Sequence, residues 1–172
     1  MTEPEPGARL DGLQVRRVDE TNWRAYRDVR LAALLDTPAA FGSTYAREAA
    51  FGDERWLDRV RGPAVTWLGV RGALPVGTVT SLRFEEQAPD ETCLVGMWVA
   101  GHARGSGVGE VLIGTALTEA RERGLRRVTL DVAVENLPAR RLYERLGFRP
   151  TGRSGSLEHD PTVAEIELAC DL

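Results

Sequence analysis

The sequence of 172 residues contains no lysine, so all 22 of its basic residues are arginines. A Walker-type phosphate loop requires Gly-Lys-Ser or Gly-Lys-Thr at the start of a helix, and Schiff-base catalysis requires a lysine amine. The absence of lysine excludes both. Every basic site instead carries a planar guanidinium group whose charge is permanent.

Cysteine and histidine are also scarce. Cys93 and Cys170 lie far apart within apolar segments, and His102 and His159 are isolated. Because no cluster has metal-ligand spacing, the sequence predicts no metal site. We expect the cysteines to be small buried hydrophobic residues rather than a disulfide pair or a nucleophile.

Long apolar segments are missing as well. No run approaches the ~20 residues of a membrane span. The first residues, Met-Thr-Glu-Pro-Glu-Pro, have neither the basic nor the apolar region of a signal peptide. A net charge of −4 disfavours general binding to nucleic acid or to anionic membranes. We therefore expect a cytoplasmic protein with no nucleic-acid and no membrane partner.

The composition indicates one ordinary globular domain. Hydrophobic residues make up 42% and charged residues 28% of the sequence, which is the balance of a typical soluble protein. The length is sufficient for one core that folds alone. Residues 1–10 are polar and contain prolines, which predicts a flexible tail before a single domain over 11–172.

The pattern of hydrophobic residues predicts an α+β fold with a mixed, mostly antiparallel sheet. The expected strands are 13–18, 64–70, 75–84, 93–100, 128–134, 148–153 and 162–170, and the expected helices are 23–35, 52–60, 110–123 and 136–147. A central parallel strand–helix–strand crossover runs from 93 to 134. The connection 35–45 is either a lid or substrate wall, or a surface loop held by Phe41.

The crossover contains the most informative segment, Arg104-Gly-Ser-Gly-Val-Gly109, between a buried strand and a helix. Glycines at 105, 107 and 109 permit positive φ and lack the Cβ atoms that would keep a phosphate away. Backbone N–H groups at a helix start form an anion site, and Arg104 adds a cation. The residues therefore predict a pyrophosphate site.

The residues alone leave two alternatives to the predicted pyrophosphate site. Glycine-rich turns between strands and helices are common, and most bind nothing. A dinucleotide fingerprint requires Gly-x-Gly-x-x-Gly, but its last position is Glu110 when counted from Gly105 and Leu112 when counted from Gly107. Asp131 lies about twenty residues further on, where that fingerprint places an acid, so this alternative is weakened and not eliminated.

Two segments match the signatures of a known family. The first is the Arg104–Gly109 segment, which fits an Arg/Gln-x-x-Gly-x-Gly/Ala loop. The second, about thirty residues later, is Asn136-x-x-Ala139-x-x-Leu142-Tyr143-Glu144-x-x-Gly147-Phe148. Together they resemble the GNAT superfamily of acetyl-CoA-dependent N-acetyltransferases. The likeness extends from about Leu94 to Gly152 and is weaker before that.

The resemblance implies the GNAT acyl-CoA N-acyltransferase fold and acetyl-CoA as cosubstrate, without a metal. In this fold two strands separate, and the pantetheine arm pairs with unpaired backbone of Met97, Trp98 and Val99. The pyrophosphate is bound by the loop residues Arg104, Gly105, Ser106, Gly107, Val108 and Gly109. Ser106 is either the helix N-cap, which we favour, or a hydroxyl donor to phosphate.

The implied reaction transfers an acetyl group to a primary amine by direct attack in a ternary complex. A backbone N–H near Val99 holds the oxyanion, and Tyr143, which also contacts the cofactor, protonates the leaving thiolate; the alternative for Tyr143 is a core aromatic residue. Asn136 caps its helix and is implied to hydrogen-bond the cofactor or its sulfur. Glu91 is the candidate general base, although a solvated acidic turn explains it equally well and a water chain can replace it.

The expected acceptor is an amine of a small molecule or of a protein. Acidic residues within 35–58 and 85–91 are compatible with a cationic acceptor. Exposed sheet edges in such folds are compatible with a homodimer. Two other functions stay open: a CoA-binding regulatory module without turnover, and an NAD(P)-binding oxidoreductase.

Overall fold

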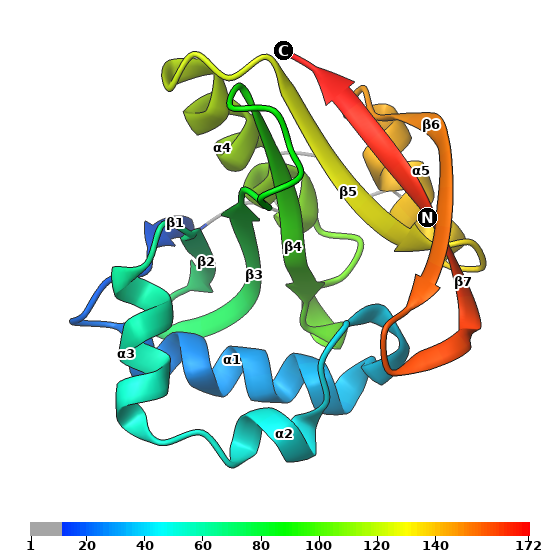
Figure 1. The fold of residues 1–172 in the computed structure, drawn as a ribbon. Coiled ribbons are helices and arrows are strands. Elements are labelled where there is room, and N and C mark those ends of the chain that lie inside the picture. The colour runs from blue at the N-terminus through cyan, green and yellow to red at the C-terminus, as the bar shows by residue number, and fades with distance from the viewer. Residues whose placement is uncertain (1–11) are drawn as a thin grey trace, which may run out of the picture.

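One seven-stranded sheet organises the computed structural model, which describes residues 12–172. The tail predicted at 1–10 lies outside the described residues. The strands follow the order β1-β2-β3-β4-β5-β7-β6 across the sheet (Figure 1). Their bounds are β1 (Leu13–Arg17), β2 (Val65–Arg71), β3 (Leu74–Leu82), β4 (Glu91–Val99), β5 (Arg127–Ala133), β6 (Arg149–Leu157) and β7 (Asp160–Asp171).

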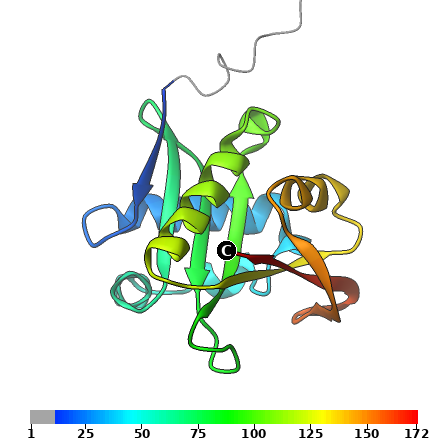
Figure 2. The same cartoon turned by 90° about the horizontal axis from the view of Figure 1, so that it is seen from above.

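Helices cover both faces of this sheet. They are α1 (Trp23–Asp36), α2 (Tyr45–Ala49), α3 (Asp53–Arg61), α4 (Val108–Glu122) and α5 (Leu137–Arg145), with short 3-10 turns η2 (Pro38–Ala40) and η3 (Gly101–Ala103). Figure 2 shows α4 in front of the sheet and α1 behind it. None of the helices described between residues 12 and 172 is long and apolar enough to cross a membrane.

Alternation along the strands explains the two layers, because successive side chains point to opposite faces. Trp67 packs in the core under α4 and α5, whereas its neighbour Leu68 packs in the core under α1 and α3. Val128, Leu130 and Val132 of β5 all join the α4–α5 core. Both cysteines are free and buried, as predicted.

Strand pairing confirms the predicted α+β class. Only β4 and β5 run parallel among the described strands, and every other neighbouring pair is antiparallel. Helix α4 makes the crossover between these two strands, and Gly124 follows its end with a φ of 74°, the left-handed conformation that stops a helix. A Rossmann fold needs a mostly parallel sheet, so the NAD(P)-binding alternative is wrong for this fold.

Three differences from the predicted elements affect the site. Turn η2 folds part of the connection expected at 35–45, and helix α2, which was not predicted, begins at the end of that connection. Strand β4 begins at Glu91, so this residue belongs to a strand and not to the acidic turn before it. The hairpin of β6 and β7 is longer than expected, because β6 is mostly exposed and polar and therefore lacks the hydrophobic alternation that marks a strand.

Candidate active site

The site begins where β4 and β5 separate. Their parallel ladder joins only Glu91–Cys93 to Arg127–Thr129, and the strands then diverge toward their C-terminal ends (Figure 1). The other edge of β4 stays paired with β3, and the other edge of β5 with β7. Backbone N–H and C=O groups on the two facing edges are therefore left outside the ladder. They border a cavity of about 1770 Å³.

A β-bulge in β4 adds to this separation. Thr78 pairs with Trp98 and Thr80 pairs with Val95, so β4 uses one residue more than β3 over this stretch. Gly96 lies within the bulge with a φ of 62°, a conformation that favours glycine. Because a bulge bends its strand and re-aims the following residues, it directs Met97, Trp98 and Val99 toward the cavity, which all three line.

The glycine-rich loop leads directly into α4 at the same end of the sheet. Gly105 and Gly107 have φ values of 71° and 86°, and Gly107 is the N-cap of α4 without a side-chain capping bond. The N–H groups of Val108, Gly109 and Glu110, in the first turn of α4, have no intrahelical acceptor because no helical carbonyl precedes them by four residues. This arrangement suits an anion, which the helix dipole also favours.

Gly109 has a different role from the one predicted for it. It lies inside the helix and is not among the glycines with positive φ. A Cβ atom at this position would lie 2.9 Å from Leu142 Cδ2 and 3.2 Å from Met97 Cε. The missing side chain therefore allows α4 to pack against α5 and β4, and the positive φ predicted for Gly109 is wrong.

Ser106 is not the N-cap, because the cap is Gly107. The Ser106 hydroxyl donates to the carbonyl of Ala103 at 2.6 Å and accepts from Arg71 Nη2 at 3.3 Å. It closes the turn before the helix instead of capping the helix itself.

Arg104 does not present a free cation. Its Nε donates to the Val99 carbonyl at 2.9 Å, and its Nη2 pairs with the carboxylate of Asp36. The same Asp36 oxygen accepts from Trp98 Nε1 at 2.9 Å. These hydrogen bonds, the one from Trp98 first, lower the pKa of Asp36. Asp36 belongs to no motif of the sequence, yet it joins the end of α1 to both β4 and the glycine-rich loop.

The second signature places four residues on the cavity wall, and Asn136 and Tyr143 are the polar ones. Asn136 caps α5, as predicted, because its Oδ1 accepts from the Ala139 N–H at 3.3 Å. Tyr143 lines the cavity with only 7% of its surface exposed, and its ring packs edge-on against Phe148 at 5.9 Å. Burial raises the pKa of the Tyr143 phenol, which therefore stays protonated at neutral pH. Tyr143 is thus a core aromatic residue and also part of the cavity wall.

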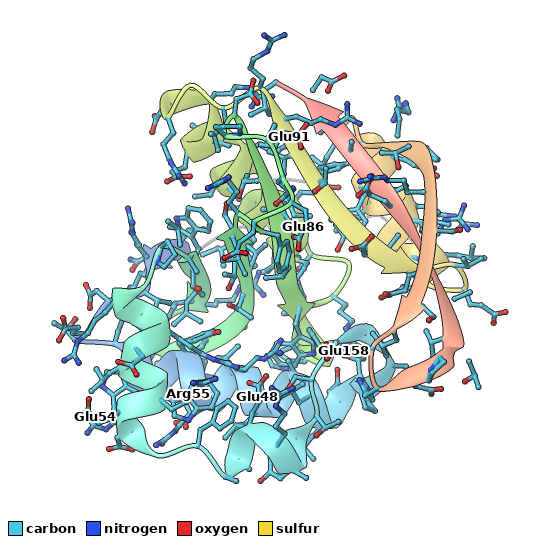
Figure 3. All side chains as sticks on the ribbon, in the orientation of Figure 1. Glu48, Glu54, Arg55, Glu86, Glu91 and Glu158 are labelled. Atoms are coloured by element: carbon cyan, nitrogen blue, oxygen red, sulfur yellow. The ribbon has the colours of Figure 1, made fainter. Side chains whose placement is uncertain are left out.

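Glu91 lies outside the cavity and is not retained as the general base. It is the first residue of β4 and pairs with Arg127 at the closed end of the parallel ladder. Val99 lies eight positions further along the strand, which corresponds to roughly 26 Å at the usual strand rise. In Figure 3, Glu86 and Glu91 lie at the end of the sheet away from Glu48 and Glu158.

Other carboxylates line the cavity. Asp131 of β5 is opposite Glu167 of β7, and Ala133 is opposite Glu165, so the acids of both strands share one face. Burial, followed by repulsion from Glu167, raises the pKa of Asp131, and burial, followed by repulsion from Asp131, raises that of Glu165. The acidic alternation in β7 was visible in the sequence, but its position beside the cavity was not.

Metal ligation has no support in the described part of the chain. Residues 12–172 contain no group of three or more His, Cys, Asp or Glu side chains placed to hold a metal ion.

Solved structures similar to this one are acetyltransferases. A GCN5-related N-acetyltransferase from Kribbella flavida superposes with a TM-score of 0.71 and 24% identity, covering 94% of this chain and 99% of the other. A ribosomal-protein-alanine N-acetyltransferase from Brucella melitensis gives a TM-score of 0.76 at 21% identity, covering 92% and 99%. Identities this low show a shared fold.

Sequence comparisons agree. Mycothiol acetyltransferase from Thermomonospora curvata is 35% identical over 145 residues, covering 80% of this chain and 44% of the relative. The mycothiol acetyltransferase from Cellulomonas flavigena is 33% identical over 166 residues, covering 88% and 45%. The chain thus spans less than half the length of these relatives. The profile of the Acetyltransferase (GNAT) family matches residues 18–148. With that match and this fold, the chain belongs to the GNAT acetyltransferase family.

Proposed function

We propose that this protein transfers an acetyl group from acetyl-CoA to a primary amine by direct attack within a ternary complex. The observation that carries the proposal is the coincidence of two features at one end of the sheet. The unpaired edges of β4 and β5 open there, and the uncapped start of α4 lies beside them.

These features fit the two polar parts of acetyl-CoA. The amides of its pantetheine arm can pair with the free edge of β4 at Met97–Val99, as an added strand does. Its pyrophosphate suits the N–H groups at the start of α4. Asn136 borders the same cavity, and its side chain is the candidate for a hydrogen bond to the cofactor near sulfur.

In the proposed reaction the amine nitrogen attacks the thioester carbonyl, a carbon–nitrogen bond forms and the carbon–sulfur bond breaks. A backbone N–H of Met97–Val99 stabilises the oxyanion. The ammonium group of the acceptor first loses a proton to solvent or to a cavity carboxylate, and the neutral amine then attacks. Tyr143 donates a proton to the departing thiolate and regains one from the second proton that the nitrogen releases as the amide forms. Because a buried phenol is a weak acid, the contribution of Tyr143 depends on its proximity to sulfur.

Thiol release from acetyl-CoA in the presence of an amine panel tests this proposal. We expect turnover with at least one class of amine, and saturation by both substrates with intersecting kinetics. Tight binding of acetyl-CoA with no turnover of any amine would instead favour a CoA-binding regulatory module, the second candidate.

The names of the similar proteins point to different acceptors. Two are mycothiol acetyltransferases and one solved neighbour acts on a ribosomal-protein alanine. The acceptor of this chain therefore has to be inferred from its own cavity.

A further inference from the structure

The half of the cavity away from α4 has two facing walls. One wall comes from α1, η2 and α2, and the other from β5, β7 and the turn between β6 and β7. The walls approach each other at Gly42, where a Cβ atom would lie 3.9 Å from Glu158 Oε2. Figure 3 shows Glu48 and Glu158 at this end of the molecule.

The first wall carries excess positive charge. Glu48 is fully buried and accepts hydrogen bonds from Arg30 Nε at 3.1 Å, Arg30 Nη2 at 2.9 Å and Arg59 Nη1 at 2.9 Å. Two guanidinium groups thus share one carboxylate, and one positive charge is uncompensated within the cluster. The exposed side chain of Arg47 lines the same wall. Asp58 of α3 lines the same side of the cavity, so two carboxylates stand against the three arginines Arg30, Arg47 and Arg59, and the net charge of this wall is positive.

Arg30 directs this charge toward the reacting end of β4. Its side chain is only 13% exposed, and its guanidinium carbon lies 4.9 Å from the centre of the Phe41 ring, which fixes its plane. Nε and Nη2 bind Glu48, while Nη1 lies 3.5 Å from the point that a Cβ atom on Gly96 would occupy. Nη1 therefore lies over the bulge, next to the backbone where the thioester carbonyl is proposed to bind.

The second wall carries negative charge. Asp131 and Glu165 lie on one face of the β5–β7 pair, and Glu158 extends this wall at the turn. Within residues 12–172, no arginine or histidine nitrogen approaches these three carboxylates within 4.0 Å. A cationic group between the walls would thus be attracted to one wall and repelled by the other.

An acceptor with charges of both signs satisfies this arrangement. We infer that the acceptor is a small zwitterion of the α-amino-acid type, whose carboxylate binds Arg30 and whose ammonium group faces Asp131 and Glu165. The inference rests on the proposed acetyl transfer. In an α-amino acid the carboxylate is attached next to the amine, so a carboxylate at Arg30 holds the nitrogen beside the bulge. Glu48 binds the Nε and Nη2 side of the Arg30 guanidinium, so the outer edge at Nη1 is the side that faces such a carboxylate.

Matched acceptors test the anchor. Thiol release from acetyl-CoA is measured with the proteinogenic L-α-amino acids and with their α-carboxamides, which keep the amine and side chain but lose the negative charge. We expect kcat/KM of the best amino acid to exceed that of its amide by roughly 10- to 100-fold, the range for a lost charge-assisted hydrogen bond. The amide amine is the weaker base, so a preference for the acid cannot arise from amine availability.

The variant Arg30→Lys distinguishes substrate recognition from a structural role. Lysine keeps the positive charge beside Glu48 but loses the planar guanidinium, so we expect the ratio of kcat/KM for the amino acid to kcat/KM for its amide to fall roughly 10-fold or more. A purely structural role would impair acid and amide equally. Arg55→Lys is the matched control, because Arg55 lies on α3 outside the cavity (Figure 3).

The outcomes separate the two levels of the proposal. Equal or better turnover of amides or simple amines would overturn the zwitterion inference and leave acetyl transfer standing, and amides would then point to a peptide N-terminus. No turnover of any acceptor, with acetyl-CoA bound, would overturn the proposed function and the inference with it. A preference for acids that Arg30→Lys leaves intact would remove Arg30 as the anchor.

Discussion

The two halves of the cavity offer different chemical groups. Near α4 the available groups are backbone N–H and C=O, exposed by glycines, a bulge and an uncapped helix start. Away from α4 they are charged side chains, held by Glu48 on one wall and carried by β5 and β7 on the other. Backbone N–H and C=O groups are available to a ligand whichever side chains surround them. The charge of a side-chain wall, in contrast, changes with single substitutions. The first half therefore suits a constant cosubstrate, and we expect the second to set specificity for the acceptor.

The largest expected effect is on the charged half. Glu48→Gln leaves Arg30 and Arg59 without their carboxylate, and breaking a buried ion pair costs about 3–5 kcal/mol of unfolding free energy. Urea unfolding at pH 7 measures the loss. Glu54→Gln, on the surface of α3, is the control and should change the free energy by less than about 1 kcal/mol. A similar loss in both variants would show that the ion pairs of Glu48 contribute little.

The same carboxylate predicts acid sensitivity. Although burial opposes it, hydrogen bonds from Arg30 and Arg59 lower the pKa of Glu48 from 4.5 to about 2. A carboxyl group whose pKa is lowered in the folded protein stabilises the fold at any pH above the pKa of the unfolded state. This stabilisation is lost as the pH falls from about 4.5 toward 2. The loss amounts to roughly 3 kcal/mol. Unfolding of Glu48→Gln measured across this range should show a shallower decline; an identical decline would contradict the assignment.

Within the half near α4, Tyr143→Phe should lower kcat by roughly 10²-fold, at the lower end for a general acid, because a buried phenol donates its proton weakly. The dissociation constant of acetyl-CoA should change less than about twofold, since the ring packing against Phe148 is kept. Steady-state kinetics and calorimetry measure the two quantities. Unchanged turnover at saturating substrate would remove Tyr143 from the acid role.

Gly107→Val tests the start of α4. Valine at a φ of 86° is strained, which costs about 1–3 kcal/mol, and its side chain would project beside the N–H groups proposed for pyrophosphate. We expect CoA affinity to fall roughly 10-fold or more. Gly124→Val introduces similar strain at the other end of α4, at a φ of 74°, and should leave affinity unchanged. Equal affinity in both variants would move the anion site elsewhere.

The smallest effect is expected at Arg104. Its guanidinium already binds Asp36 and the Val99 carbonyl, so Arg104→Gln should lower CoA affinity less than about threefold, the scale of a weak exposed ion pair. Titration calorimetry with CoA measures this. A fall in CoA affinity of more than tenfold would mean that the guanidinium leaves Asp36 to bind phosphate. Cofactor binding in the half near α4 would then also depend on a side chain.

Prediction from sequence succeeded where the pattern was local. The crossover from β4 through α4 to β5, the cap at Asn136 and the stop at Gly124 each follow from a few neighbouring residues. It failed where a partner distant in the chain decided the role. Gly109 leaves room for Leu142, and Arg104 forms an ion pair with Asp36. No sequence spacing indicates either contact.

The sequence by itself determined the fold class, the glycine-rich turn before α4 and the absence of lysine chemistry, because each depends on residue type and short-range order. Only the tertiary structure decided which charges meet in the cavity. Glu91 and Glu48 are the same residue type in the sequence. In the structure, Glu91 begins a strand at the closed end of the sheet, whereas Glu48 is enclosed by two arginines. The separation of β4 from β5 fixes which end of the sheet is open, and it depends on pairing between strands that are distant in the sequence.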